Sequence, residues 1–126
     1  MNSLFAVAIG GAVGASGRYL FNLQMMRLLG LNFPWGTLGV NIIGSFVMGV
    51  LAEGLALRFN VSAEMRSFLM TGVLGGFTTF SAFSLDASNM IERNDFGMAG
   101  IYVGASVVGS IAALFLGLYA VRTVLA

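Results

Sequence analysis

Four long apolar stretches constrain the fold of this chain more than any other feature of its sequence. They cover approximately residues 4–26, 37–57, 68–90 and 98–125. Each is long enough to cross the hydrocarbon core of a bilayer, which takes about 20 mostly apolar residues in a helix. The polar connections between them are short, so we expect residues 1–126 to form a single all-α domain with four transmembrane helices. The alternating pattern of a membrane β-barrel is absent from the sequence.

The composition excludes several classes of function. Charged residues make up only 9% of the chain, against roughly 25% in soluble domains. Histidine and cysteine are absent from the sequence, so imidazole catalysis, thiol catalysis and the usual transition-metal sites are excluded. The net charge of +1 offers no basic patch for nucleic acid. Since only five scattered carboxylates remain for catalysis, we predict that the chain is not an enzyme.

The positive charges give almost no instruction about orientation. With four spans, both termini and the 58–66 connection lie on one side, which holds Arg58, Arg66 and Arg122. The other side holds Arg27 and Arg93. Cytoplasmic loops normally carry a clear excess of Lys and Arg. Two interpretations therefore stay open: the chain inserts in both orientations and forms antiparallel pairs, or a weak bias still fixes one topology.

Small residues recur at helical spacing in the first and fourth stretches. Gly10 and Gly14 are four residues apart, and Gly100 and Gly104 repeat this spacing. Small residues allow close approach of helices in lipid, either within one chain or between two chains. Together with the even distribution of arginine, this pattern favours a homodimer.

Two polar residues inside the first two stretches require an explanation, since polar groups in hydrocarbon are costly. Arg18 could attract anions into an aqueous vestibule, or it could anchor its helix end by reaching the interface. The amide of Asn41 could donate to an anion, or it could bond to a neighbouring helix.

The third stretch concentrates glycines and hydroxyl residues between residues 71 and 84. This concentration predicts a break near the middle of the helix, which is tolerated only when it is buried in protein or lines a cavity. Such a break exposes carbonyl oxygens that suit a hard cation such as Na⁺ and amides that suit an anion. The alternative is an unbroken helix whose glycines serve close packing.

Aromatic and hydroxyl side chains then share faces of the third and fourth stretches. Phe80 and Phe83 are three residues apart, and their positive ring edges could face a small anion in a narrow path. Tyr102, Ser106 and Ser110 follow at intervals of four and form a row of hydroxyl groups. Both sets could instead be ordinary packing residues.

Four motifs spread over the whole chain carry a resemblance to a known family: residues 10–18 (GGAVGASGR), 36–41 (GTLGVN), 71–84 (TGVLGGFTTFSAFS) and 102–110 (YVGASVVGS). With these motifs the sequence resembles the Fluc, or CrcB, family of bacterial fluoride channels. The resemblance implies an antiparallel, dual-topology homodimer in the bacterial inner membrane, where two pores export fluoride passively through the lipid bilayer.

The resemblance also implies roles for individual residues. A structural Na⁺ at the dimer interface would be held by the backbone carbonyls of Gly75 and Thr78, and Arg18 would lie in the vestibule. The residues of the fluoride pore would be Asn41, Phe80, Ser81, Phe83, Ser84, Tyr102, Ser106 and Ser110. The sequence departs from the family at Ala82, where a hydroxyl residue is usual.

Two other functions remain as alternatives. A small four-helix multidrug transporter has similar length, but it needs a carboxylate in its first span, and the first stretch here contains no acid. A non-transporting membrane assembly subunit would explain the small residues but not the aromatic and hydroxyl pattern.

Overall fold

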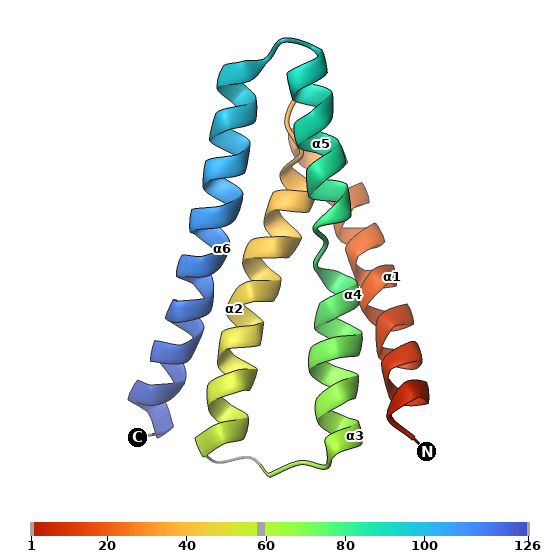
Figure 1. Ribbon diagram of the computed structural model, residues 1–126, viewed down its shortest axis with the longest axis vertical. Helices are drawn as coiled ribbons and strands as arrows, with labels where there is room; N and C mark the ends of the chain where they lie inside the picture. Colours follow the sequence, from red (N-terminus) through yellow and green to blue (C-terminus); the bar gives the residue numbers. More distant parts are fainter. Residues whose placement is uncertain (1, 58–59, 126) are drawn as a thin grey trace.

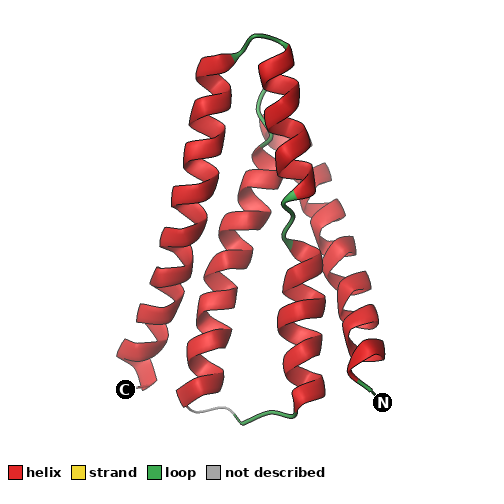
Figure 2. Cartoon of the chain, viewed as in Figure 1, coloured by secondary structure: helices red, strands yellow, loops and turns green. Residues whose placement is uncertain are grey.

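The computed structural model describes residues 2–57 and 60–125 of the chain. Within these ranges the only regular elements are helices, joined by short connections (Figure 2). In chain order they are α1 (Ser3–Leu29), α2 (Trp35–Leu57), α3 (Ala63–Arg66), the π-helix η1 (Ser67–Leu74), α4 (Gly75–Phe77), α5 (Ser81–Glu92) and α6 (Phe96–Leu125).

These elements make up four segments that are long and apolar enough to cross a membrane: α1, α2, the run Ala63–Glu92 that contains α3 to α5, and α6. The four predicted spans are therefore confirmed. The third segment starts at Ala63, earlier than expected, because Ser62 caps its first turn by accepting a hydrogen bond from the amide of Met65 at 3.1 Å. The π-helix in its first half was not predicted.

The predicted break in the third segment is confirmed. Thr78 has extended backbone angles (φ −88°, ψ 163°), and residues 78–80 separate α4 from α5 (Figure 1). The glycines before the break lower the helix propensity, as the sequence indicates. Arg58, one of the arginines counted for orientation, lies outside the described residues.

The break allows the third segment to change its neighbour. Before the break, η1 and α4 pack mainly on α1, whereas after it α5 packs on α6. The other close pair is α2 with α6 (Figure 1). Helix α1 begins and α6 ends at the same end of the bundle, as four crossings require.

The small residues of α1 pack against another segment of the chain, whereas those at the start of α6 do not. A methyl group added at Gly10 would meet the backbone of Phe68, and one added at Gly14 would collide with the backbone of Val73. These glycines therefore bring α1 against η1. By contrast, a methyl group added at Gly100 or Gly104 would meet no atom of the chain within 4 Å.

The buried core is small for a chain of this length. It contains an aromatic cluster of Phe33, Phe83 and Tyr102, in which the ring centroids of Phe33 and Tyr102 are 5.5 Å apart. Most other large apolar side chains of the four spans are exposed. Because exposed apolar area on this scale is normal only against lipid or a partner, the chain presents a membrane-facing surface.

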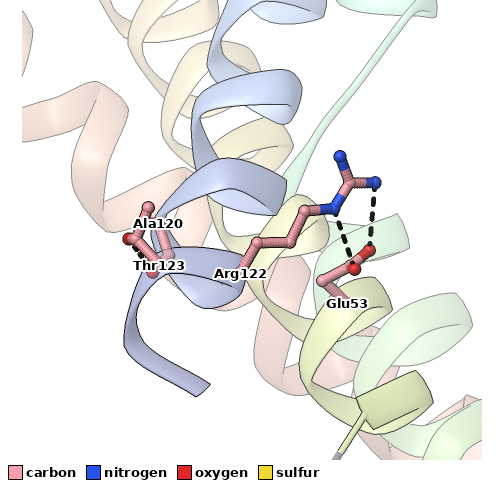
Figure 3. A network of polar contacts seen from close by, with 4 residues as sticks. All are labelled: Glu53, Ala120, Arg122 and Thr123. Carbon is pink, nitrogen blue, oxygen red and sulfur yellow. Dashed lines mark hydrogen bonds and ion pairs between the residues drawn. The ribbon is translucent and has the colours of Figure 1, made fainter. Parts of the chain in front are cut away.

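An ion pair joins the far ends of α2 and α6. Arg122 donates from Nε to Oε2 of Glu53 at 2.9 Å, and a second guanidinium nitrogen lies 3.5 Å from Oε1 (Figure 3). This pair lies close to the C-terminus, where the helices reach the edge of the apolar region.

Candidate functional site

The backbone of the break is held by side chains from two other helices. Asn41 of α2 accepts a hydrogen bond at Oδ1 from the amide of Thr79 (2.8 Å) and donates from Nδ2 to the carbonyl of Thr79 (2.9 Å). Arg18 of α1 donates from Nε to the carbonyl of Gly76 at 3.0 Å. The two side chains thus replace backbone partners that a continuous helix would have supplied.

Several carbonyl groups at the break have no partner in the described chain, and those of Gly75 and Thr78 are among them. Among the described residues, no hydrogen bond reaches the carbonyl oxygens of Gly75 and Thr78. The amide of Thr79, which would bond to Gly75 in a regular helix, is bonded to Asn41 instead. The carbonyl of Thr78 loses its helical partner because the amide of Ala82 donates to Oγ1 of Thr79 at 3.1 Å. Both residues were predicted to hold a cation, and unpaired carbonyls are suitable ligands for Na⁺.

An open hollow of about 430 Å³ lies beside the break. Residues from the break, α2, α5 and α6 line it, and the ones named by the sequence prediction are Asn41, Gly75, Thr78, Phe80, Phe83, Ser106 and Ser110. The hollow is mostly apolar, since its other lining residues include Met48, Leu74 and Ile111. It therefore combines an apolar wall with a few polar groups, as binding sites commonly do.

The predicted row of three hydroxyl groups divides into two parts. Ser106 and Ser110 line the hollow, and their Oγ atoms are buried without a hydrogen-bond partner in the described part of the chain. Tyr102 is fully buried, and its hydroxyl donates to Oδ2 of Asp86 at 3.0 Å. The Tyr102 proton is therefore committed within the chain, whereas those of the two serines are available to a ligand.

Phe80 of the break and Phe83 of α5 lie side by side but in different surroundings. Their ring centroids are 5.5 Å apart with the planes tilted by 50°. Phe83 is buried against Tyr102, with 5.2 Å between the ring centroids. Phe80 is 77% exposed, so most of its ring projects away from the chain.

The remaining residues of the prediction lie outside this hollow. Ser81 and Ser84 are exposed, and the Oγ of Ser81 lies 3.4 Å from Oγ1 of Thr79. Ala82, where the sequence departs from the family, lines a second hollow of about 370 Å³ together with Asp86 and Arg93. Arg18 lines neither hollow. Its vestibule role and the pore roles of these serines stay predictions.

Sequence reasoning missed Asp86. This half-buried carboxylate lies inside the third segment, one turn beyond Ala82, and holds the hydroxyl of Tyr102. A charged residue within an apolar stretch was the signal that could have identified it.

Comparison with known proteins shows which family the chain is similar to. The sequence profile described as "CrcB-like protein, Camphor Resistance (CrcB)" matches residues 5–118. A relative in Agrobacterium fabrum is 58% identical over 94% of both chains, and one in Cereibacter sphaeroides is 57% identical over 97% of this chain and 96% of its own. A third, in Chelativorans sp., is 54% identical over 99% of this chain and its own full length. All three are named fluoride-specific ion channel FluC. With identities of this size over nearly its full length, the chain belongs to the CrcB-like family of membrane proteins.

Proposed function

We propose that this chain is the subunit of a fluoride channel that carries F⁻ passively out of the bacterial cytoplasm across the inner membrane. The relatives described above bear the name of such a channel and not of an enzyme. The four apolar spans place the chain in a membrane that it crosses several times.

The observation that carries the proposal is the pair of buried, unpaired hydroxyl groups of Ser106 and Ser110 in the hollow. Buried polar groups normally have a partner, so a ligand that accepts hydrogen bonds is expected there. Fluoride is a small, strongly hydrated anion, and neutral donors can replace its water without holding it too tightly to leave. A fixed cation would bind it more strongly and slow its release.

Two copies of the chain complete the pathway in this proposal. The hollow is open on one side, and the ring of Phe80 beside it is 77% exposed. A second, antiparallel copy would cover this side and bury the ring. The near balance of arginine between the two sides of the membrane supports insertion in both orientations.

Each residue of the predicted pore then has a place in the proposal. Ser106 and Ser110 donate hydrogen bonds to the ion, and Phe80 and Phe83 offer ring edges. Asn41, Ser81 and Ser84 contribute polar groups near the break. Tyr102 forms the wall behind Phe83, since its hydroxyl is bonded to Asp86.

A structural Na⁺ between the two copies belongs to the same proposal. The carbonyls of Gly75 and Thr78 have no other partner in the described chain, and both residues line the open hollow. Hard cations take several oxygen ligands, so two carbonyls from one chain leave the shell incomplete, and a second copy would supply two more. The bound ion would supply positive charge that holds the two breaks together.

The alternatives account for fewer observations. A proton-coupled multidrug transporter needs a carboxylate in its first span, and α1 contains no acid. An assembly subunit would leave the two unpaired serines without a purpose.

A flux assay on purified protein in liposomes tests the proposed function. Vesicles loaded with potassium fluoride and treated with valinomycin should release F⁻, which an external electrode measures. Vesicles loaded with potassium chloride should retain their chloride. Protein-free vesicles are the control. Vesicles that stay impermeable to fluoride, or that pass chloride equally fast, would overturn the proposal.

A further inference from the structure

Arg18 occupies an unexpected position for a cation that attracts anions. Its side chain is half-buried, and its Nε donates to the carbonyl of Gly76, which lies between the two unpaired carbonyls of Gly75 and Thr78. It lines neither of the two hollows. The guanidinium therefore faces the broken backbone.

The packing of α1 brings Arg18 to this place. Gly14, one turn earlier, lies directly against the backbone of Val73 and Phe77, so α1 and the end of η1 are in close contact. Gly17 leaves space for the ring of Phe77, which would be 3.6 Å from a methyl group added there. In a continuous helix the amide of Phe80 would bond to Gly76, and at the break Arg18 supplies the donor instead.

The charge of Arg18 has no partner nearby. Neither ion pair of the described residues includes it: one joins Arg93 with Asp95, and the other joins Arg122 with Glu53. A half-buried positive charge without an acid is expensive in a membrane protein and is normally retained for function. Its guanidinium contacts, at Gly76, the same short run of backbone that carries the carbonyls suited to a cation.

We infer that Arg18 is a positioning residue for the break. We also infer that its positive charge lowers the affinity of the monovalent cation site at Gly75 and Thr78. This inference rests on the proposed sodium site. The guanidinium fixes the carbonyl of Gly76, which lies next to Gly75 and two residues before Thr78, and so restrains the run of backbone that carries the two carbonyls. At the same time, like charges at short range repel in a medium of low dielectric constant. The restrained backbone of the carbonyls favours binding of the cation, and the positive charge of Arg18 opposes it.

The effect of the charge can be separated from that of the hydrogen bond by substitutions at and near Arg18. Arg18→Gln retains a hydrogen-bond donor and removes the charge, whereas Arg18→Lys retains the charge. Asn22→Asp leaves Arg18 in place and adds a carboxylate one helical turn away, where it can neutralise the guanidinium. Arg27→Gln is the matched control, because Arg27 is an exposed arginine at the end of the same helix.

The experiment is a sodium titration of thermal unfolding for the purified protein in detergent. Trp35 is the only tryptophan and packs on Phe33 at 4.7 Å between ring centroids, so its fluorescence reports unfolding. Sodium replaces N-methylglucamine at constant ionic strength, and the midpoint of the stabilisation gives the apparent affinity. Arg18→Gln and Asn22→Asp should lower the sodium concentration at the midpoint about tenfold. Arg18→Lys and Arg27→Gln should leave it near the wild-type value.

A purely structural role for Arg18 predicts the opposite sign, because a disordered break would bind sodium more weakly. Unchanged or weaker sodium binding in both Arg18→Gln and Asn22→Asp would overturn the inference. If Arg18→Gln does not fold, Asn22→Asp decides alone. Sodium stabilisation and fluoride flux of the wild-type protein are measured separately. A wild-type protein that sodium does not stabilise would overturn the proposed sodium site and this inference with it, and one that sodium stabilises but that passes no fluoride would overturn the proposed channel function alone.

Discussion

At the scale of single residues, the hydrogen-bond partner decides which polar side chains are available to an ion. Tyr102 and Asn41 are engaged with Asp86 and with the backbone of Thr79. Ser106 and Ser110 have no partner in the described chain. All four residues look equally suitable in the sequence, so only their surroundings separate those that shape the site from those that can touch the ion.

Replacing either unpaired serine with alanine should reduce transport without harming the fold. The loss of a hydrogen bond to an ion costs about 1.5–3 kcal/mol, which corresponds to a reduction in flux of about tenfold to a hundredfold. The free energy of unfolding should stay the same or rise, since an unpaired buried hydroxyl is itself unfavourable. Fluoride efflux and thermal unfolding measure the two effects. A destabilised Ser106→Ala or Ser110→Ala variant with normal flux would contradict this role.

Phe80→Ile should reduce fluoride flux by about twofold to tenfold, since aromatic contacts are worth about 0.5–1.5 kcal/mol. Phe80 is 77% exposed in the single chain, so its loss should leave the chain folded and the dimer assembled. Phe5→Ile, which changes an exposed ring near the start of α1, is the control and should keep full flux. Normal efflux from vesicles with the Phe80 variant would count against an aromatic pore.

At the scale of helices, the break has a structural consequence as well as a chemical one. It lets the third segment pack on α1 in its first half and on α6 in its second half. A straight helix could not follow both neighbours, which diverge along the bundle (Figure 1). Residues 78–80 therefore connect the two halves of the fold, and the break leaves the carbonyls of Gly75 and Thr78 without a helical partner.

Close packing of α1 on η1 should be sensitive to a single methyl group. Gly14→Ala places a Cβ against the backbone of Val73 and should lower the free energy of unfolding by about 1–3 kcal/mol. Gly11→Ala is the matched control, because its methyl group meets no atom of the chain within 4 Å. Unfolding in a mixed-micelle titration measures both variants. Equal stability of the two would show that the helices do not pack this closely.

At the scale of the whole molecule, the single chain leaves its hollow and part of its fourth segment uncovered. Its hollow is open on one side, and the glycines of the fourth segment at positions 100 and 104 face open space. The two pairs of glycines that the sequence associates with helix packing therefore differ. Gly10 and Gly14 pack within the chain, whereas Gly100 and Gly104 face no other part of it.

Gly75→Val should weaken the dimer and remove its stabilisation by sodium, and the effect should arise between chains. Within the chain, a Cβ at Gly75 meets only the carbonyl of Met70 at 3.7 Å, which is ordinary contact. The bulk of valine would therefore act on the partner and the proposed cation. Cross-linking and the sodium dependence of unfolding measure the result. An intact dimer with normal sodium stabilisation would remove the assignment.

Dual insertion should be visible in reporter fusions. C-terminal fusions to alkaline phosphatase and to green fluorescent protein should both be active, since the arginine distribution hardly favours one side. Adding positive charge at the connection before α3 and at the first residue of α3 with Asn60→Lys and Ala63→Lys should shift the population to one orientation and reduce flux, because antiparallel pairs are lost. A single fixed orientation of the unmodified chain would reject dual insertion.

Hydrophobicity and helix propensity act locally, so the sequence by itself determined the four spans, the break near the middle of the third and the pairing of Phe80 with Phe83. The exact partner of each polar group depends on segments that are distant in the chain. Asn41 and Thr79 are 38 positions apart, and Arg18 and Gly76 are 58 apart. Only the tertiary structure could decide that Asn41 and Arg18 hold the break, that Asp86 binds Tyr102 and that the two serines are left unpaired, because hydrogen bonds form between groups that packing brings within 3.5 Å, whatever their separation in sequence.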